Sequence, residues 1–175
     1  AAQELGLETG WDAAGNLLIT LAGQDRRAPR LLTGSHLDSV PTGGHYDGLA
    51  GAIAGLSVQA AMRDLGHVPA RDLTTIGIRG EESVWYGIAY VGSRLAVGSL
   101  PHTQLQTLKR GDSGQTLAQH MRSVGVDVDA LKSAAPWITA ANTKAFIELH
   151  IEQAPILVNE GLPVAIPTTI RGNVR

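Results

Sequence analysis

Six histidine and carboxylate side chains of the kind that bind metals or transfer protons fall into four short blocks of this chain. They are His36 with Asp38, then Asp47 behind a glycine-rich turn, then the adjacent pair Glu81 and Glu82, and finally His150. Imidazole and carboxylate groups are the ligands of hydrolytic metal sites, and a carboxylate that does not bind the metal can act as a general base. The pattern indicates a hydrolytic metal centre.

Each block also has an ordinary structural interpretation when it is taken alone. A single histidine in an apolar segment, such as His36, is usually a packed core residue. Asp47 precedes an apolar helix-like run and has the pattern of a helix N-cap. Glu81 and Glu82 could form a solvated charged turn. In the segment 147–153, strict strand alternation could place every second side chain, including that of His150, on one solvent-facing surface.

Asp38 favours the metal-site interpretation of His36. A carboxylate two residues along a strand projects from the same face, where it could orient the imidazole or accept its second N–H. Two neighbouring acids after a buried strand, here Glu81 and Glu82, can divide the chemistry between metal binding and general base catalysis. The remaining histidines lie among turn or surface residues and are assigned no role: His45, His67, His102 and His120.

Composition and charge exclude several classes of protein. The 175 residues are 43% hydrophobic with a formal net charge of −2, which allows one ordinary core and gives no bias toward nucleic acid or acidic membranes. No apolar run reaches the roughly 18 to 20 residues of a membrane span and no signal-peptide pattern opens the chain, so we expect a cytoplasmic protein. With no cysteine, any metal must be bound by histidine and carboxylate groups.

Strands and helices are expected to alternate along the chain. Strands are predicted at 16–21, 30–33, 73–78, 145–151 and 162–170, the first two as a hairpin-like pair. A buried helix is predicted over 48–65, with Asp47 at its N-terminus, and a short helix over 115–124. Such alternation is typical of an α/β fold with a mixed sheet flanked by helices, in which ligands gather beyond the carboxyl ends of strands. The histidines and the acidic pair lie near those predicted ends.

Three segments closely resemble the hydantoinase/carbamoylase amidase family: 34–48, 79–83 and 148–153. The family includes N-carbamoyl-L-amino-acid amidohydrolases, β-ureidopropionases and allantoate amidohydrolases, within the dinuclear metal aminoacylase/carboxypeptidase superfamily. The resemblance spans essentially the whole chain and holds in both order and spacing. It implies an aminopeptidase-like α/β catalytic domain that hydrolyses a linear amide or ureido C–N bond in a small molecule.

The resemblance also implies two bound divalent metal ions. His36 and His150 would bind one ion, Glu82 would bind the second, and Asp47 would bridge the two. Zinc or manganese would suit these ligands, and cobalt or nickel are also compatible with them.

Catalytic and substrate roles follow from the same resemblance. Glu81 would be the general base, Asp38 the carboxylate that orients or tunes the site, and Gln153 a substrate contact. The chain departs from the family at Ala154, where glycine is usual, at residues 83–86, and at Pro167. None of these departures removes a ligand, although residues 83–86 adjoin the catalytic pair and bear on the choice of substrate.

Residues 1–175 would form the N-terminal portion of a single, truncated catalytic domain. The lid or dimerisation domain and a C-terminal segment with the last histidine ligand would lie beyond Arg175, so this chain alone is expected to be inactive and to hold at most one metal well. The full-length protein is expected to be a homodimer. Two alternatives remain: a peptidase or N-acyl amino-acid deacylase of the same superfamily, and a non-catalytic binding module that retains the fold.

Overall fold

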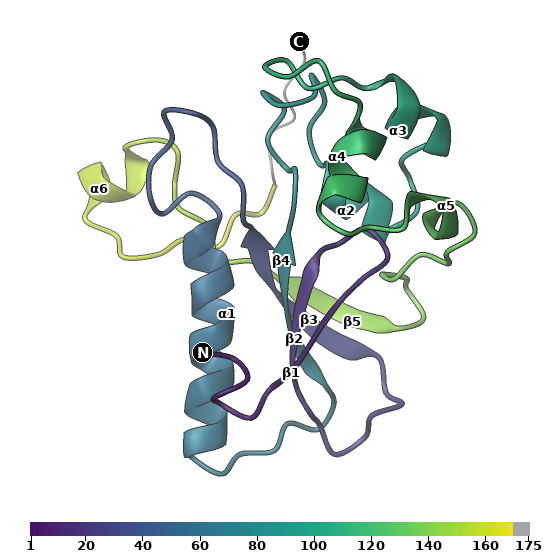
Figure 1. The fold of residues 1–175 in the computed structure, drawn as a ribbon. Helices are drawn as coiled ribbons and strands as arrows, with labels where there is room; N and C mark the ends of the chain where they lie inside the picture. The colour runs from purple at the N-terminus through teal and green to yellow at the C-terminus, as the bar shows by residue number, and fades with distance from the viewer. Residues whose placement is uncertain (170–175) are drawn as a thin grey trace.

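A mixed five-stranded sheet organises the computed structural model, which describes residues 1–169 (Figure 1). The strands are β1 (Glu8–Trp11), β2 (Leu17–Leu21), β3 (Arg30–His36), β4 (Leu73–Ile78) and β5 (Thr143–Ile147). The helices are α1 (Leu49–Asp64), α2 (Val91–Ala96), α3 (His102–Thr107), α4 (Leu117–Ser123), α5 (Val128–Leu131) and α6 (Ile156–Glu160). The expected α/β class with a mixed sheet is confirmed.

The strand order β1-β2-β4-β3-β5 places β4 at the centre of the sheet. β2 runs antiparallel to β1 and β4, whereas β3 runs parallel to both β4 and β5. Every residue of β4 is buried. Because β3, β4 and β5 are parallel, their carboxyl ends lie at one edge of the sheet, where functional groups can gather.

The predicted hairpin between the segments at 16–21 and 30–33 is wrong, because β4 lies between these two strands. The connection after β2 does not turn back on itself. It runs instead beside the segment that leads into β4, where the Gln24 and Asp25 N–H groups donate to the Pro69 and Ala70 carbonyls at 2.9 and 3.1 Å. The wholly buried β4 thereby gains a hydrogen-bonded partner on each side.

The strand predicted over 145–151 ends at Ile147 in the structure. β5 pairs only with β3, and the chain leaves the sheet at Glu148, whose carboxylate accepts a hydrogen bond from the Ser35 hydroxyl. His150 therefore lies in a loop, and the alternation expected of a strand does not apply to it. The strand predicted over 162–170 is also absent from residues 162–169, where two prolines cannot donate ladder hydrogen bonds; Ile170 lies outside the described residues.

Helix α1 forms where a helix is predicted and packs closely on the sheet (Figure 1). The expected burial is not found, because only one face of α1 meets the sheet, and Leu49, Ile53 and Val58 are exposed. A Cβ atom on Gly51 would come within 2.3 Å of the Leu149 carbonyl oxygen, and one on Gly55 within 2.7 Å of the Thr75 hydroxyl. Gln59 is fully buried and donates to the Ile19 and Leu73 carbonyls at 2.8 Å each. These contacts fix the N-terminal end of α1 beside the carboxyl ends of β3 and β5.

The short helices α2, α3, α4 and α5 contribute to a hydrophobic cluster beside the sheet. Its buried members are Ala14, Val91, Leu95, Leu100, Leu105, Leu117, Ala118, Met121, Val128 and Leu131. This cluster anchors α2, which follows the turn that carries Glu81 and Glu82. Among the helices of residues 1–169, none is both long enough and apolar enough to cross a lipid bilayer.

Candidate metal centre

Three of the predicted ligands come together beyond the strand ends. His36 is the last residue of β3, Asp47 lies just before α1, and His150 lies in the loop after β5. One ligand atom from each lies within 4.8 Å of the other two. Asp47 Oδ1 is 3.7 Å from His36 Nε2 and 3.4 Å from His150 Nε2, and the two Nε2 atoms are 3.4 Å apart.

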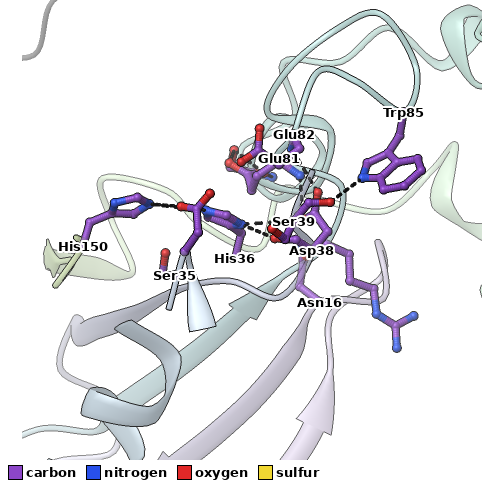
Figure 2. Close-up of polar contacts among 12 residues, drawn as sticks. Asn16, Ser35, His36, Asp38, Ser39, Glu81, Glu82, Trp85 and His150 are labelled. Atoms are coloured by element: carbon purple, nitrogen blue, oxygen red, sulfur yellow. Dashed lines mark hydrogen bonds and ion pairs between the residues drawn. The ribbon is translucent and has the colours of Figure 1, made fainter. Parts of the chain in front are cut away.

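Hydrogen bonds at Nδ1 set the orientation of both imidazoles, and Figure 2 shows the one between His36 and Asp38. His36 Nδ1 donates to the main-chain carbonyl of Asp38 at 2.6 Å, and His150 Nδ1 donates to the carbonyl of Ile151 at 2.9 Å. A carbonyl oxygen can only accept, so each neutral ring carries its proton on Nδ1 and presents a lone pair at Nε2. Two such lone pairs and the Asp47 carboxylate therefore converge, an arrangement that a cation stabilises.

The separations between the donor atoms fit a divalent metal ion. Zinc–nitrogen and zinc–oxygen bonds of about 2.0 to 2.2 Å in a tetrahedron require ligand atoms roughly 3.3 to 3.6 Å apart. The measured separations of 3.4, 3.4 and 3.7 Å lie at or close to that range. His36, Asp47 and His150 thus form a donor set that matches a His/carboxylate metal site in both chemistry and spacing.

The structure does not support the N-cap interpretation of Asp47. The N-cap of α1 is Gly48, and no side chain caps this helix. The Asp47 side chain is only 9% exposed and lies between the two histidines. Gln153 Nε2 approaches it at 3.4 Å, so the predicted substrate-contacting residue also lies at this site.

Asp38 acts differently from the sequence expectation. Its carboxylate does not accept the imidazole N–H; Oδ1 is 4.0 Å from His36 Nδ1, and the Asp38 main-chain carbonyl takes that hydrogen bond. The two carboxylate oxygens accept instead from the N–H groups of Glu81 and Glu82, both at 3.0 Å (Figure 2). Because β3 ends at His36, residue 38 has already left the strand. Asp38 therefore links the His36 ring to the turn that bears the acidic pair.

Glu81 lies on that turn as a half-buried carboxylate. Its Oε1 accepts hydrogen bonds from the Ser93 N–H and hydroxyl, both at 2.9 Å. Burial raises the pKa of Glu81; the Ser93 hydrogen bonds oppose this rise, and the nearby Asp38 charge adds to it. A carboxyl group with a raised pKa is better matched to accepting a proton near neutral pH.

Glu82 is adjacent to Glu81 but lies outside the three-residue donor group found among residues 1–169. The Asp38 carboxylate holds its main chain at 3.0 Å, which keeps Glu82 on the same turn (Figure 2). The solvated-turn interpretation does not fit, because both glutamates are partly buried. The role of Glu82 as a ligand of a second ion remains a prediction.

A cavity of about 470 Å³ adjoins this turn. Apolar side chains line most of it, with polar groups that include Asp38, Arg79 and Arg110. Trp85 forms part of its wall and donates its indole N–H to the Ser39 carbonyl at 3.1 Å (Figure 2). The segment 83–86, which departs from the family pattern, is thus fixed against the loop that follows Asp38.

Sequence reasoning missed two polar residues that support the site. Ser93 binds the Glu81 carboxylate, and the side chain of the fully buried Asn16 hydrogen-bonds the main chain of Arg79, just after β4, and of Gly92 in α2. Serine and asparagine are common in turns, and neither residue lies near the acidic pair in the sequence. Only their position in the fold reveals them.

Gly48 allows the close approach between α1 and the His36 ring. Its φ of +71° is unfavourable for residues with a side chain, and a Cβ atom there would lie 2.5 Å from His36 Nδ1 and Cε1. We therefore expect Gly48→Ala to displace the imidazole and weaken metal binding by roughly 10–100-fold, as loss of an orienting contact does.

Metal titration of the intact protein by calorimetry would measure this effect. Gly44→Ala is the matched control, because it lies in the same loop and a Cβ atom there would meet nothing within 4 Å. Equal metal affinity in the two variants would contradict the placement of Gly48 against a ligand.

Comparison with protein-family models identifies the class of protein. The model described as peptidase family M28 matches residues 16–110, which is more than half of the chain. The chain therefore belongs to peptidase family M28.

Two known relatives show which enzymes the chain is similar to. The chain is 39% identical over 170 residues to an N-carbamoyl-L-amino acid amidohydrolase of Geobacillus stearothermophilus, covering 97% of this chain and 41% of that protein. It is 34% identical over 167 residues to a ureidoglycolate hydrolase of Arabidopsis thaliana, covering 94% and 35% respectively. The chain thus spans well under half the length of these relatives.

A solved structure has the same fold as the chain. The amidase of the hydantoinase/carbamoylase family from Burkholderia vietnamiensis superposes with a TM-score of 0.79 at 31% identity, covering 91% of this chain and 37% of that one. The resemblance to hydantoinase/carbamoylase amidases that the sequence motifs indicate is thereby confirmed.

Proposed function

We propose that the protein containing this chain is a metal-dependent amidohydrolase that cleaves a linear ureido C–N bond in a small molecule. An N-carbamoyl-L-amino acid is the favoured substrate, and allantoate, ureidopropionate or ureidoglycolate are related candidates. The observation that carries the proposal is the convergence of His36, Asp47 and His150 beside the turn that holds Glu81. The names of the relatives, which concern carbamoyl and ureido compounds, support the same chemistry.

In this proposal the donor residues divide between two ions. His36 and His150 would hold one ion, Glu82 would hold the other, and Asp47 would be shared by both. A bound pair of divalent ions would polarise the substrate carbonyl and lower the pKa of water. The metal could be zinc or manganese, and cobalt or nickel would also accept these ligands.

Glu81 carries the proton in the reaction. Its carboxylate takes a proton from the attacking water as the new C–O bond forms, and then passes that proton to the nitrogen that leaves as the C–N bond breaks. Asp38 maintains the geometry by holding the main chain of the turn, because both of its oxygens bind turn N–H groups. Gln153, which lies beside Asp47, contacts the substrate.

The wider organisation follows from the same proposal. Residues 1–175 form the N-terminal part of one catalytic domain, and the intact protein is a cytoplasmic homodimer with a separate lid or dimerisation domain. The chain covers only 41% of the Geobacillus relative, which leaves room in such a protein for these additional segments.

Peptide or N-acyl amino-acid hydrolysis is the second candidate. The description of the matching family as a peptidase family favours it. The same ligands and base would serve an amide carbonyl as well as a ureido carbonyl, so the difference lies in the pocket that receives the substrate.

A substrate panel separates the two candidates. The intact protein is stripped of metal, reloaded with one divalent metal at a time, and assayed with N-carbamoyl amino acids, allantoate, ureidoglycolate, N-acetyl amino acids and dipeptides. We expect metal-dependent turnover of ureido compounds with the highest kcat/KM. Preference for acyl or peptide substrates would select the second candidate, and no turnover of any compound would favour a binding module.

A further inference from the structure

Ser93 is the nearest partner of the Glu81 carboxylate among the described residues. It is the third residue of α2, twelve positions after Glu81, and it contributes both its main-chain N–H and its hydroxyl. Glu81 Oε1 accepts from both donors at 2.9 Å, whereas Oε2 lies 2.9 Å from the same hydroxyl. The hydroxyl has one proton and lies equally close to both oxygens, so the main-chain N–H, which donates to Oε1, is the donor that distinguishes Oε1 from Oε2.

The main chain of the Glu81 turn is fixed to the same segment. The N–H of Tyr90 donates to the Glu81 carbonyl and that of Val91 to the Gly80 carbonyl, both at 2.9 Å. Tyr90 adopts a left-handed conformation with φ of 65°, the only positive φ among the non-glycine residues described. Such a conformation is held only where the surrounding contacts require it, which here are the bonds across the turn.

Asn16 fixes α2 to the end of β4. Its side chain is fully buried, donates to the Gly92 carbonyl at 3.2 Å and accepts from the Arg79 N–H at 3.0 Å. The Asp12 carboxylate holds the same amide at 2.7 Å. A Cβ atom on Gly92 would come within 2.3 Å of the Arg79 carbonyl oxygen, so only glycine allows this approach. The residue before Ser93 is therefore fixed relative to the strand that leads into Glu81.

We propose that Ser93 is a positioning residue for Glu81: its N–H and hydroxyl anchor Oε1 so that Oε2 is the oxygen that accepts and releases the proton. This inference rests on the proposed function, in which Glu81 is the general base. A glutamate side chain has several freely rotating bonds, and proton transfer requires one orientation within hydrogen-bonding reach of the reacting water. Ser93 supplies that orientation, and Asn16 keeps Ser93 in place.

Kinetics of Ser93 variants in the intact, metal-loaded protein test the inference. Ser93→Ala keeps the N–H and loses the hydroxyl, so we expect kcat to fall by about 10–100-fold, part of the full value of a general base. KM and metal content should not change, because the proposal gives Ser93 a contact with Glu81 and none with substrate or metal. Ser93→Thr, which restores a hydroxyl, should recover most of the activity.

Two further variants complete the comparison. Ser93→Cys replaces the hydroxyl by a weak donor of similar size and should behave like Ser93→Ala; it carries the test if the alanine variant does not fold. Ser99→Ala is the matched control, since Ser99 lies just beyond α2 and its exposed hydroxyl donates to the Arg94 carbonyl and not to Glu81. That control should retain full activity.

A double-mutant cycle with Glu81→Gln separates positioning from general stabilisation. A residue that acts through the Glu81 carboxylate has nothing left to orient once that carboxylate is gone, so Ser93→Ala should cause no further loss in the Glu81→Gln background. The same proportional loss in both backgrounds, or an unchanged kcat in Ser93→Ala and Ser93→Cys, would overturn the inference. Near-normal activity of Glu81→Gln alone would instead show that the proposed function assigns the wrong base.

Discussion

Glu81→Gln is expected to lower kcat by about 100- to 10,000-fold while the protein keeps its metal, because a general base contributes that much to a hydrolysis. Glutamine has nearly the same shape and can still accept from Ser93, but its amide cannot take a proton from water near neutral pH. Turnover of an N-carbamoyl amino acid, with metal content measured in parallel, would show the effect. The intact protein is the sample for both measurements.

Glu160→Gln provides the control for this substitution. Glu160 is the exposed last residue of α6, and its replacement makes the same chemical change away from the site. Activity near the unmodified level in Glu81→Gln would remove Glu81 from the mechanism. Loss of metal together with activity would instead indicate that Glu81 is a ligand.

Asp47→Asn should have the second large effect, this time on metal binding. The carboxylate lies 3.4 Å from His150 Nε2 and 3.7 Å from His36 Nε2, so its charge faces both imidazoles. Partners that merely orient a ligand contribute roughly 10–100-fold to metal affinity, so loss of a bridging ligand should weaken binding by more than about 100-fold. Activity should fall with metal occupancy and recover only in part at high metal concentration.

Asp64→Asn is the matched control for Asp47→Asn. Asp64 lies at the other end of α1 and pairs at the surface with Arg63. Its substitution should change neither metal affinity nor turnover, since exposed ion pairs contribute little. If Asp47→Asn bound metal as tightly as this control, the convergence of His36, Asp47 and His150 would have no part in metal binding.

Local patterns predicted the longer elements, such as α1 and β4, but missed several short helices and did not predict how the strands pair. The run that forms α1 is long and rich in alanine and leucine, and the run that forms β4 combines isoleucine and leucine with β-branched threonine, so composition indicates both elements. The order of strands depends on contacts between distant segments, and a hairpin between neighbouring runs is only the simplest choice. In the structure the segment before β4 pairs with the connection after β2, which no local pattern shows.

The residues at which β3 and β5 end explain why the site differs from the sequence expectation. Because β3 ends at His36, the alternation that would direct the Asp38 carboxylate toward the imidazole no longer applies at residue 38. Because β5 ends at Ile147, His150 reaches Asp47 from a loop instead of from a strand face. Residue types and spacing selected His36, Asp47 and His150, which the fold brings together, whereas the hydrogen bonds of Asp38 and Ser93 required the fold.

Anomalous diffraction from crystals of the intact, zinc- or manganese-loaded protein would test the central claim most directly. We expect one metal peak bound by His36, Asp47 and His150 and a second, roughly 3.5 to 4 Å away, bound by Asp47 and Glu82. Glu81 should lie beside the pair with Oε1 still bound to Ser93. Absence of a peak between His36 and His150 while metal binds elsewhere in the protein would contradict the account.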